Sequence, residues 1–317
     1  MRTATHFLSL ATFTALLVPA LEVTATLLEI EPLRLQVVNP QRVAQANDRK
    51  AEADRLFKQG LSQFDTSQYQ AALESWQTAL EIYQEIDSLQ EQGYTLNALG
   101  TLFRIAGQVQ AGIELHQQAL EIARELNDRS GEGRILGSLG NASLQLGQYE
   151  QAIDLYEQQL AITREIGDRQ GEGNALGNLG LAYSDLGQYE WAINFHEQSL
   201  SIAREIGDRL REGGALGNLG GVYWNLGRYE EAVIFYEQYL VIAREIGDRQ
   251  GEGNALGNLG LAYSDLGQYE WAIDLYEQQL AITREIGYRA GEGNALGNLG
   301  LAYNNLGQYE RAIDLYE

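Results

Sequence analysis

The 317-residue chain contains no cysteine, three prolines, one methionine and three histidines. The absence of cysteine excludes disulfides, thiolate metal ligands, cysteine nucleophiles and a lipoprotein anchor, and it leaves the redox compartment open. All three prolines (Pro19, Pro32 and Pro40) precede residue 41, whereas 34 of the 35 glycines follow residue 92. The chain therefore has two compositional parts, an amino-terminal leader with a linker and a longer, glycine-rich region.

Basic residues are also scarce, because 22 lysines and arginines stand against 44 aspartates and glutamates, for a net charge of −22. Residues 1–52 carry five side chains of each sign, so the whole acidic excess lies in 53–317. A field of this sign repels phosphate backbones and anionic lipid headgroups. We therefore expect no nucleic-acid partner, and we expect protein or peptide partners that bind through neutral or basic segments.

The chain has one apolar run near its start, over residues 7–18, preceded by Arg2 and His6 and followed by Pro19 and Ala20. This order is typical of a secretory signal peptide, and the run is too short for a stable membrane span. We predict a signal peptide over 1–25, with cleavage as late as residue 46, a linker over 26–52, and export to the periplasm or the extracellular space. A mis-assigned start, with the protein in the cytoplasm, is the alternative.

The most informative feature that is present is a repeat with a period of 40 residues. Full copies lie at 133–172, 173–212, 213–252 and 253–292, looser copies at 53–92 and 93–132, and a truncated copy at 293–317. Residues 164–193 are identical to 244–273. A fixed period of this size indicates a solenoid, in which each unit buries its apolar face against its neighbours.

Each copy has the spacing of two amphipathic helices, because apolar or small residues recur every three or four positions. In the copy 253–292 they are Leu256, Leu259, Gly260, Tyr263, Ala272, Leu275, Tyr276 and Leu280. Gly267 and Gly287 suit the left-handed residue that ends a helix, and Asp168, Asp208 and Asp248 suit the cap that begins one. Since helices joined by short loops pack antiparallel, we predict an all-α array of about seven helix-turn-helix units over 53–317.

Some positions predict packing contacts within the units. One position of the first helix is glycine in all seven copies (Gly220 is an example), and the second helix has alanine in six copies and Gly112 in the other; we predict that these small residues touch. His116 and His196 replace a tyrosine of other copies, and we interpret them as core residues. Arg164 and Asp168 have the spacing of an exposed ion pair on a helix.

The pattern Leu256-x2-Leu259-Gly260-x2-Tyr263, followed by Ala272-x3-Tyr276, resembles the tetratricopeptide repeat. The 40-residue length and the REIGDRxGE exit are similar to the repeats of the LGN/Pins scaffolds, kinesin light chain and many bacterial arrays. This resemblance implies a right-handed α-solenoid. The small residue that the family has late in its second helix is replaced in four copies, by Gln159, Ser199, Tyr239 and Gln279, so we predict different packing there.

The resemblance also implies a function, because the family binds extended or helical peptides along the concave face formed by the first helices. The positions that match this face carry Asn174, Asn178, Asn218, Asn254, Asn258, Asn294 and Asn298. A carboxamide both donates and accepts, so such a row can pair with a peptide backbone of any sequence. The alternative is that duplication copied asparagines that bond adjacent helices. Leu181, Leu261 and Leu301 should lie near the groove, and Trp224 either anchors a partner or fills the space beside Gly221.

No residue set is a candidate for catalysis, for metal binding or for a cofactor, and glycine-rich strings in the array follow no strand. We therefore predict a non-enzymatic interaction scaffold. The alternative is an N-terminal sensor array of a larger enzyme, since the leader-plus-array layout resembles cyanobacterial proteins that often carry a C-terminal CHAT domain, a caspase-like protease fold. A third hypothesis is self-association through the uncapped C-terminal repeat.

Overall fold

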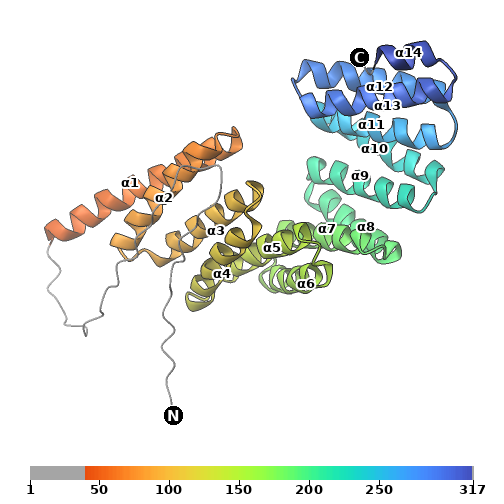
Figure 1. Cartoon of the computed structure of the whole chain (residues 1–317). Helices are drawn as coiled ribbons and strands as arrows, with labels where there is room; N and C mark the ends of the chain where they lie inside the picture. Colours follow the sequence, from red (N-terminus) through yellow and green to blue (C-terminus); the bar gives the residue numbers. More distant parts are fainter. Residues whose placement is uncertain (1–39, 316–317) are drawn as a thin grey trace. The chain divides into compact units, whose positions relative to one another are not determined.

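The computed structural model describes residues 40–315, within which every regular element is an α-helix (Figure 1). Contacts divide the chain into Met1–Ala46 and Asn47–Glu317, and helices α2 to α14 all belong to the second unit. The helices are α1 (Pro40–Asp65), α2 (Tyr69–Glu85), α3 (Leu89–Ile105), α4 (Val109–Glu125), α5 (Arg129–Gln145), α6 (Tyr149–Ile166), α7 (Arg169–Asp185), α8 (Tyr189–Ile206), α9 (Arg209–Asn225), α10 (Tyr229–Ile246), α11 (Arg249–Asp265), α12 (Tyr269–Glu285), α13 (Arg289–Asn305) and α14 (Tyr309–Asp314). The predicted all-α repeated array is confirmed.

Odd-numbered helices are the first helices of the units and even-numbered helices are the second. The turns between them contain the predicted left-handed glycines, with φ of 74° at Gly267 and 70° at Gly287. The predicted caps are also confirmed, because the side chains of Asp168, Asp208 and Asp248 each accept a hydrogen bond from the backbone N–H three residues later. Local sequence therefore determines where each helix begins and ends.

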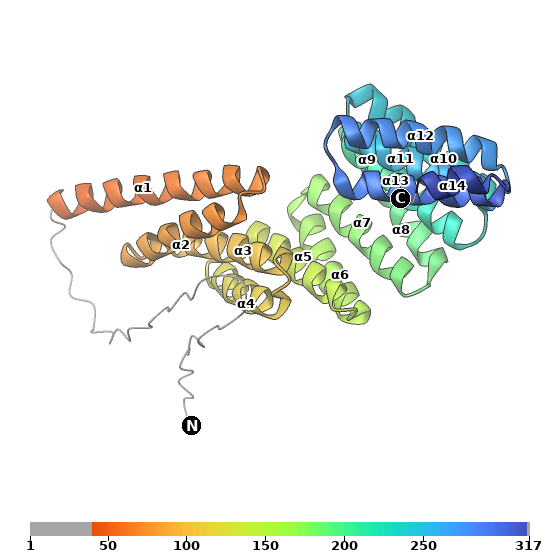
Figure 2. The ribbon, with the colours of Figure 1, turned by 45° about the horizontal axis from the view of Figure 1, so that its top comes forward.

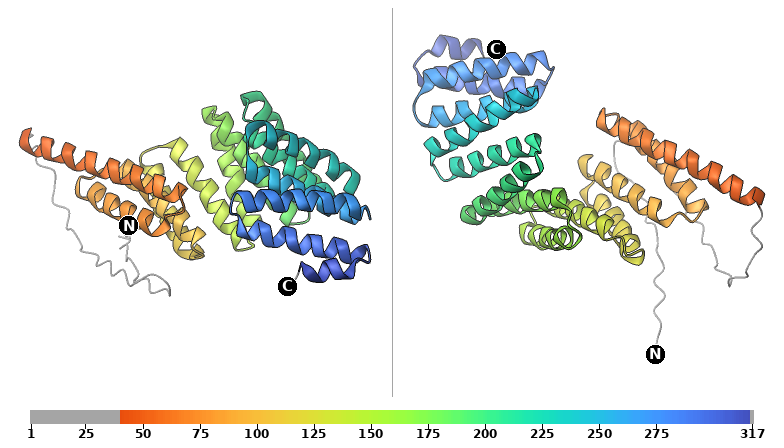
Figure 3. Two further views of the ribbon diagram at one scale, coloured as in Figure 1. Left: turned by 90° about the horizontal axis from the view of Figure 1, so that it is seen from above. Right: turned by 180° about the vertical axis from the view of Figure 1, so that it is seen from behind.

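Consecutive helices pack side by side along the array (Figures 2 and 3). Each first helix from α3 to α11 also contacts the first helix of the next unit, in the pairs α3–α5, α5–α7, α7–α9, α9–α11 and α11–α13. The first helices therefore form a continuous layer, and this layer carries the candidate site.

The predicted signal peptide lies outside the described residues. Helix α1 begins at Pro40, so it covers residues 40–52 of the stretch predicted as linker. Proline is favourable in the first turn of a helix, where its missing N–H has no partner in any case. Two cations of this stretch bind the array, since Arg49 pairs with Glu85 and Lys50 Nζ lies 2.8 Å from Glu91 Oε1.

The recurring glycine of the first helix lies against an aromatic ring of the second helix, and the predicted contact between small residues is confirmed in one unit, where a methyl group on Gly112 would lie 2.7 Å from the backbone oxygen of Gly100. A methyl group added to Gly220 would lie 2.5 Å from Tyr236 Cε1. The alanine of the same second helix, Ala232, is fully buried one turn before the ring. His116 and His196 occupy this ring position in two units, and both are buried, as predicted for core residues.

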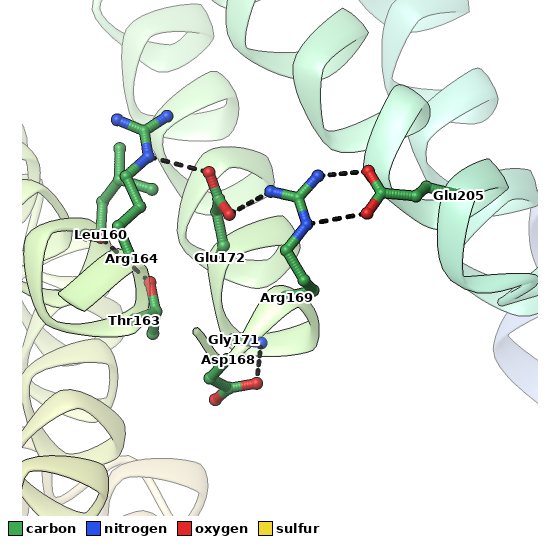
Figure 4. A network of polar contacts seen from close by, with 8 residues as sticks. All are labelled: Leu160, Thr163, Arg164, Asp168, Arg169, Gly171, Glu172 and Glu205. Carbon is green, nitrogen blue, oxygen red and sulfur yellow. Dashed lines mark hydrogen bonds and ion pairs between the residues drawn. The ribbon is translucent and has the colours of Figure 1, made fainter. Parts of the chain in front are cut away.

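A buried glutamate connects three helices at the junction between units (Figure 4). Arg164, at the end of α6, donates from Nε to Glu172 Oε1 of α7 at 2.8 Å. Arg169, at the start of α7, pairs with the other oxygen of Glu172 and also with Glu205 at the end of α8. The same network recurs around Glu132, Glu212 and Glu252.

The predicted exposed ion pair between Arg164 and Asp168 is wrong, because Arg164 pairs with Glu172 instead. Asp168 lies outside the helix as its cap and accepts from the Gly171 backbone N–H at 2.9 Å, so the guanidinium of Arg164 reaches past it to Glu172. Burial alone raises the pKa of Glu172, but the hydrogen bonds from Arg164 and Arg169 outweigh burial and hold that pKa below its usual range. The glutamate is therefore charged at neutral pH, although it is only 7% exposed.

Replacing Glu172 by Gln removes the charge that both arginines share. We expect the free energy of unfolding to fall by about 1–3 kcal/mol, because a buried hydrogen-bonded charge is lost and its partners must find water. Urea unfolding followed by circular dichroism at pH 7 measures the change. Glu205→Gln alters the exposed end of the same network and serves as the control. Equal losses in the two variants would contradict the role given to the buried carboxylate.

Candidate functional site

Two adjoining grooves cross the layer of first helices. The first groove lies over α5, α7 and α9 and has a volume of about 600 Å³. The second groove lies over α9, α11 and α13 and has a volume of about 520 Å³. Asn218 and Tyr239 line both grooves, so the two are continuous at α9.

All seven asparagines predicted for the binding face line these grooves. Asn174 and Asn178 line the first groove, Asn218 lines both, and the second has Asn254, Asn258, Asn294 and Asn298. Asn174 Oδ1 accepts a hydrogen bond from Arg211 Nε at 2.7 Å, and Asn254 lies near enough to the Tyr239 hydroxyl to lower the pKa of that hydroxyl, against the larger raising effect of burial. The side chains of the other five make no hydrogen bond within residues 40–315. Contacts with adjacent helices, the alternative explanation for the row, therefore account for at most two of the seven asparagines.

The floor of the grooves is formed by second-helix side chains at positions where the first helix has glycine. A methyl group on Gly257 would lie 2.5 Å from Gln279 Nε2, and one on Gly217 would lie 3.2 Å from Tyr239 Cδ1. Gln159 and Gln279 are each 7% exposed, and the Oε1 of each has no hydrogen-bond partner. The predicted change of packing at these positions is confirmed, since the glycines make room for larger floor residues.

The apolar side chains of the predicted site do not all reach the grooves. Leu181 lines the first groove and Leu261 the second, whereas Leu301 is 51% exposed and lines neither. Trp224 also lines neither groove: its Nε1 donates to Asp265 Oδ2 of the next first helix at 2.7 Å, and its ring packs among buried residues of α10 and α11. The structure thus places Trp224 at a contact between units.

The two grooves differ in charge. Arg134, Arg211 and Asp248 line the first groove, and the second is lined by amides, glycines, Tyr239 and Leu261, with no charged side chain in its described lining. The guanidinium of Arg134 lies over the ring of Tyr94, 5.1 Å from its centroid. The second groove therefore offers neutral donors and acceptors.

Among the side chains that the structure describes, no group of histidine, aspartate and glutamate could hold a metal ion. No helix in 40–315 is both long and apolar enough to cross a membrane.

Sequence reasoning missed several residues of the groove lining. It treated Gln159, Tyr239 and Gln279 as packing residues only, and it did not consider Arg134 or Arg211. A usable signal was present, because each large floor residue is matched by a glycine in the first helix of its own unit. That pairing indicates a side chain that reaches through the first-helix layer to its open face.

A tetratricopeptide repeat family model matches residues 91–158, 131–205, 211–285 and 265–317, which is well over half of the chain. No curated protein sequence matches the chain. The matches at 131–205 and 211–285 each span two of the helix pairs described above, α5 to α8 and α9 to α12.

Solved structures share the fold. A Rap protein complexed with Competence and Sporulation Factor has a TM-score of 0.63 and 18% identity, covering 86% of this chain and 77% of that one. A signal-transduction ATPase with numerous domains from Pyrococcus horikoshii, which has a tetratricopeptide repeat sensor, gives a TM-score of 0.64 and 17% identity over 87% and 48% of the two chains. The nearly identical TPR-like repeats of a putative kinesin light chain from Podosopora anserina have a TM-score of 0.50 and 25% identity, covering 58% of this chain and 90% of that one.

Proposed function

The chain belongs to the tetratricopeptide-repeat family, and on this premise we propose that it is a non-enzymatic scaffold that binds extended peptide segments of partner proteins along the two grooves. The observation that carries the proposal is the row of free carboxamides at one position of successive units, formed by Asn178, Asn218, Asn258 and Asn298. Each offers two N–H donors and an acceptor. An extended peptide presents unpaired backbone groups that match such a row.

The charge of the chain supports partners with neutral or basic segments. The net charge is −22, and the second groove has no cation in its described lining to hold an acidic segment. The complex of a Rap protein with Competence and Sporulation Factor supports ligand binding by an array of this fold. Long-range attraction should make binding weaken as salt is added.

The central test removes two carboxamides from the second groove. In the variant Asn218→Ala with Asn258→Ala, we expect the affinity for a groove-bound peptide to fall at least tenfold, because each lost hydrogen bond contributes about 1 kcal/mol. The probe is a fluorescein-labelled extended peptide, selected from a synthetic library on the wild-type protein and followed by fluorescence anisotropy.

The matched control is Asn194→Ala with Asn225→Ala, which removes two exposed carboxamides that line neither groove. It should bind the peptide as the wild type does. Unchanged affinity in the groove variant, with its helical circular dichroism retained, would refute the assignment of the groove.

A second candidate function is regulation of a catalytic domain on a longer chain. The similarity to an ATPase that has a tetratricopeptide repeat sensor supports this candidate, since the array covers 48% of that protein. In this role the grooves bind a signal peptide or a partner and the bound state controls an enzyme, such as a CHAT-type protease. The intact mass of the protein from its native source tests the idea: a mass well above 35.2 kDa supports it, and a mass at or below that value rejects it.

A further inference from the structure

Four junctions between units have a cap aspartate, at the starts of α5, α7, α9 and α11, and beside it is a position that a side chain of the protein can fill. At Asp128 the occupant is Tyr94, whose hydroxyl donates to Asp128 Oδ2 at 3.0 Å. At Asp208 it is Arg211, which pairs with Asp208 Oδ2 and donates to Asn174. At three of these junctions, those of Asp128, Asp208 and Asp248, a side chain of the protein itself occupies the position.

At Asp248 the phenol of Tyr239 occupies this position. Its hydroxyl would lie 3.1 Å from a methyl group on Gly251, and its ring would lie 3.1 Å from one on Gly213. The ring thus lies between the two first helices that flank the junction. Phenols therefore fill two of the three occupied junctions.

The junction at Asp168 is open. It holds a pocket of about 250 Å³, the corner pocket, between α5, the end of α6 and the start of α7. Asp168 Oδ1 accepts from the Gly171 N–H, and its Oδ2 has no hydrogen bond within the described residues. Arg134 stands at the position that Tyr94 has in the preceding unit, but its guanidinium lies over the ring of Tyr94 and does not bond Asp168.

A second observation marks the corner pocket as a binding site. Gln159 lines it and is 7% exposed, and its Oε1 has no partner. The equivalent residue is Ala119 where Tyr94 fills the junction and is Tyr239 itself at Asp248. A buried amide acceptor and a carboxylate oxygen are thus both unpaired around one small cavity, which favours an occupant with a hydrogen-bond donor.

We propose that the corner pocket binds a tyrosine of the bound segment, with the phenol hydroxyl donating to Asp168 Oδ2, as Tyr94 donates to Asp128, and with a backbone N–H of that segment donating to Gln159 Oε1. The proposal rests on the proposed function only for the source of the tyrosine. Ile162 and the open backbone at Gly133 provide apolar walls for the ring. A guanidinium, as in Arg211, suits this pocket less well, because Arg134 already brings a positive charge to its lining.

The test uses N-acetyl-tyrosinamide as probe on the full chain, with the dissociation constant measured by saturation-transfer difference NMR. We expect saturable binding in the millimolar range, at least fivefold tighter than that of N-acetyl-phenylalaninamide, which lacks the hydroxyl. Asp168→Asn keeps an oxygen to cap α7 but loses the second acceptor, so it should abolish this fivefold preference. Tighter binding of N-acetyl-argininamide than of the tyrosine probe would overturn the phenol assignment.

The variant Arg134→Tyr locates the site. It places a tyrosine where the preceding unit has Tyr94, so we expect it to fill the corner pocket, to abolish probe binding and to raise the melting temperature. Arg134→Ala, which leaves the pocket open, should retain probe binding. Undiminished binding to Arg134→Tyr with helicity retained would overturn the proposal.

The corner pocket and the grooves are tested separately. The variant Asn218→Ala with Asn258→Ala leaves the corner pocket untouched, so it should bind the probe normally even when it loses the peptide. Loss of the peptide alone in that variant supports both sites. Retained peptide binding with a functional probe site rejects only the grooves, and an absent probe site rejects only the corner pocket.

Discussion

Gly220→Ala is expected to destabilise the array by about 2–4 kcal/mol, although alanine is the better helix former. The added methyl group would lie 2.5 Å from Cε1 and 2.6 Å from Cδ1 of Tyr236, a ring that is only 4% exposed. A ring held in the core cannot retreat without moving α10 away from α9. Urea unfolding monitored by circular dichroism measures the loss.

Gly214→Ala, on the same helix, is expected to change stability in the opposite direction. No atom lies within 4 Å of the methyl group that this substitution adds, so the gain in helix propensity, about 1 kcal/mol, should appear almost undiminished. The two variants share the helix and the chemical change and differ only in surroundings. If both shift the unfolding midpoint in one direction, the glycine at 220 is not explained by the ring.

The same close contact explains why weak helix formers persist in the first helices. Rings or imidazoles face the recurring glycine in successive units, for example Tyr156 against Gly140 and His196 against Gly180. These helices therefore depend on packing against the second helices for much of their stability. The buried glutamate networks then couple each unit to the next, as expected for an array stabilised by nearest-neighbour contacts.

Features set by local sequence were predictable. The period of 40 residues gave the number of units, the glycines at 267 and 287 gave the ends of helices, and the aspartate at 168 gave a cap. Each of these depends on residues within one or two turns of the chain. The row of asparagines was also found correctly on one face, because a helix position repeated in every unit returns to the same face.

Features set by contacts between units were not predictable in the same way. Arg164 passes its near neighbour Asp168 and binds Glu172, and Trp224 bonds Asp265 of the following unit. The identical stretches 164–193 and 244–273 show the limit most clearly. Asp168 borders an open pocket and Asp248 a filled one, because Gln159 and Tyr239 lie outside the identical residues.

The second large expected effect is a loss of stability in acid, caused by the two buried imidazoles of His116 and His196. Burial lowers the pKa of His196 to about 4, and burial together with the Arg104 charge lowers that of His116 to about 4. Neither nitrogen of either ring has a hydrogen-bond partner in the structure. The folded protein therefore resists protonation at two positions where the unfolded chain accepts a proton readily.

The pH window follows from these values. An unfolded imidazole has its ordinary pKa of 6.5 and the folded one about 4, so the unfolded state binds more protons between the two. Stability is thus full above pH 6.5, falls by about 1.4 kcal/mol per pH unit for each imidazole below it, and levels off below pH 4. The glutamates with lowered pKa values lose their contribution only as pH falls below 4.5.

His196→Tyr should remove one of these acid-sensitive groups without disturbing the fold. Residues 173–193 are identical to 253–273, and Tyr276 fills the same position in that unit with 1% exposure, so the new ring meets neighbours that already accommodate it. Between pH 7 and pH 5 the variant should lose about 2 kcal/mol less stability than the wild type, measured by urea unfolding at each pH. Changes in overall charge repulsion affect both proteins alike and cancel in the difference. Parallel pH profiles for the two proteins would show that folding leaves the pKa of His196 unchanged, so that burial does not hold the imidazole neutral.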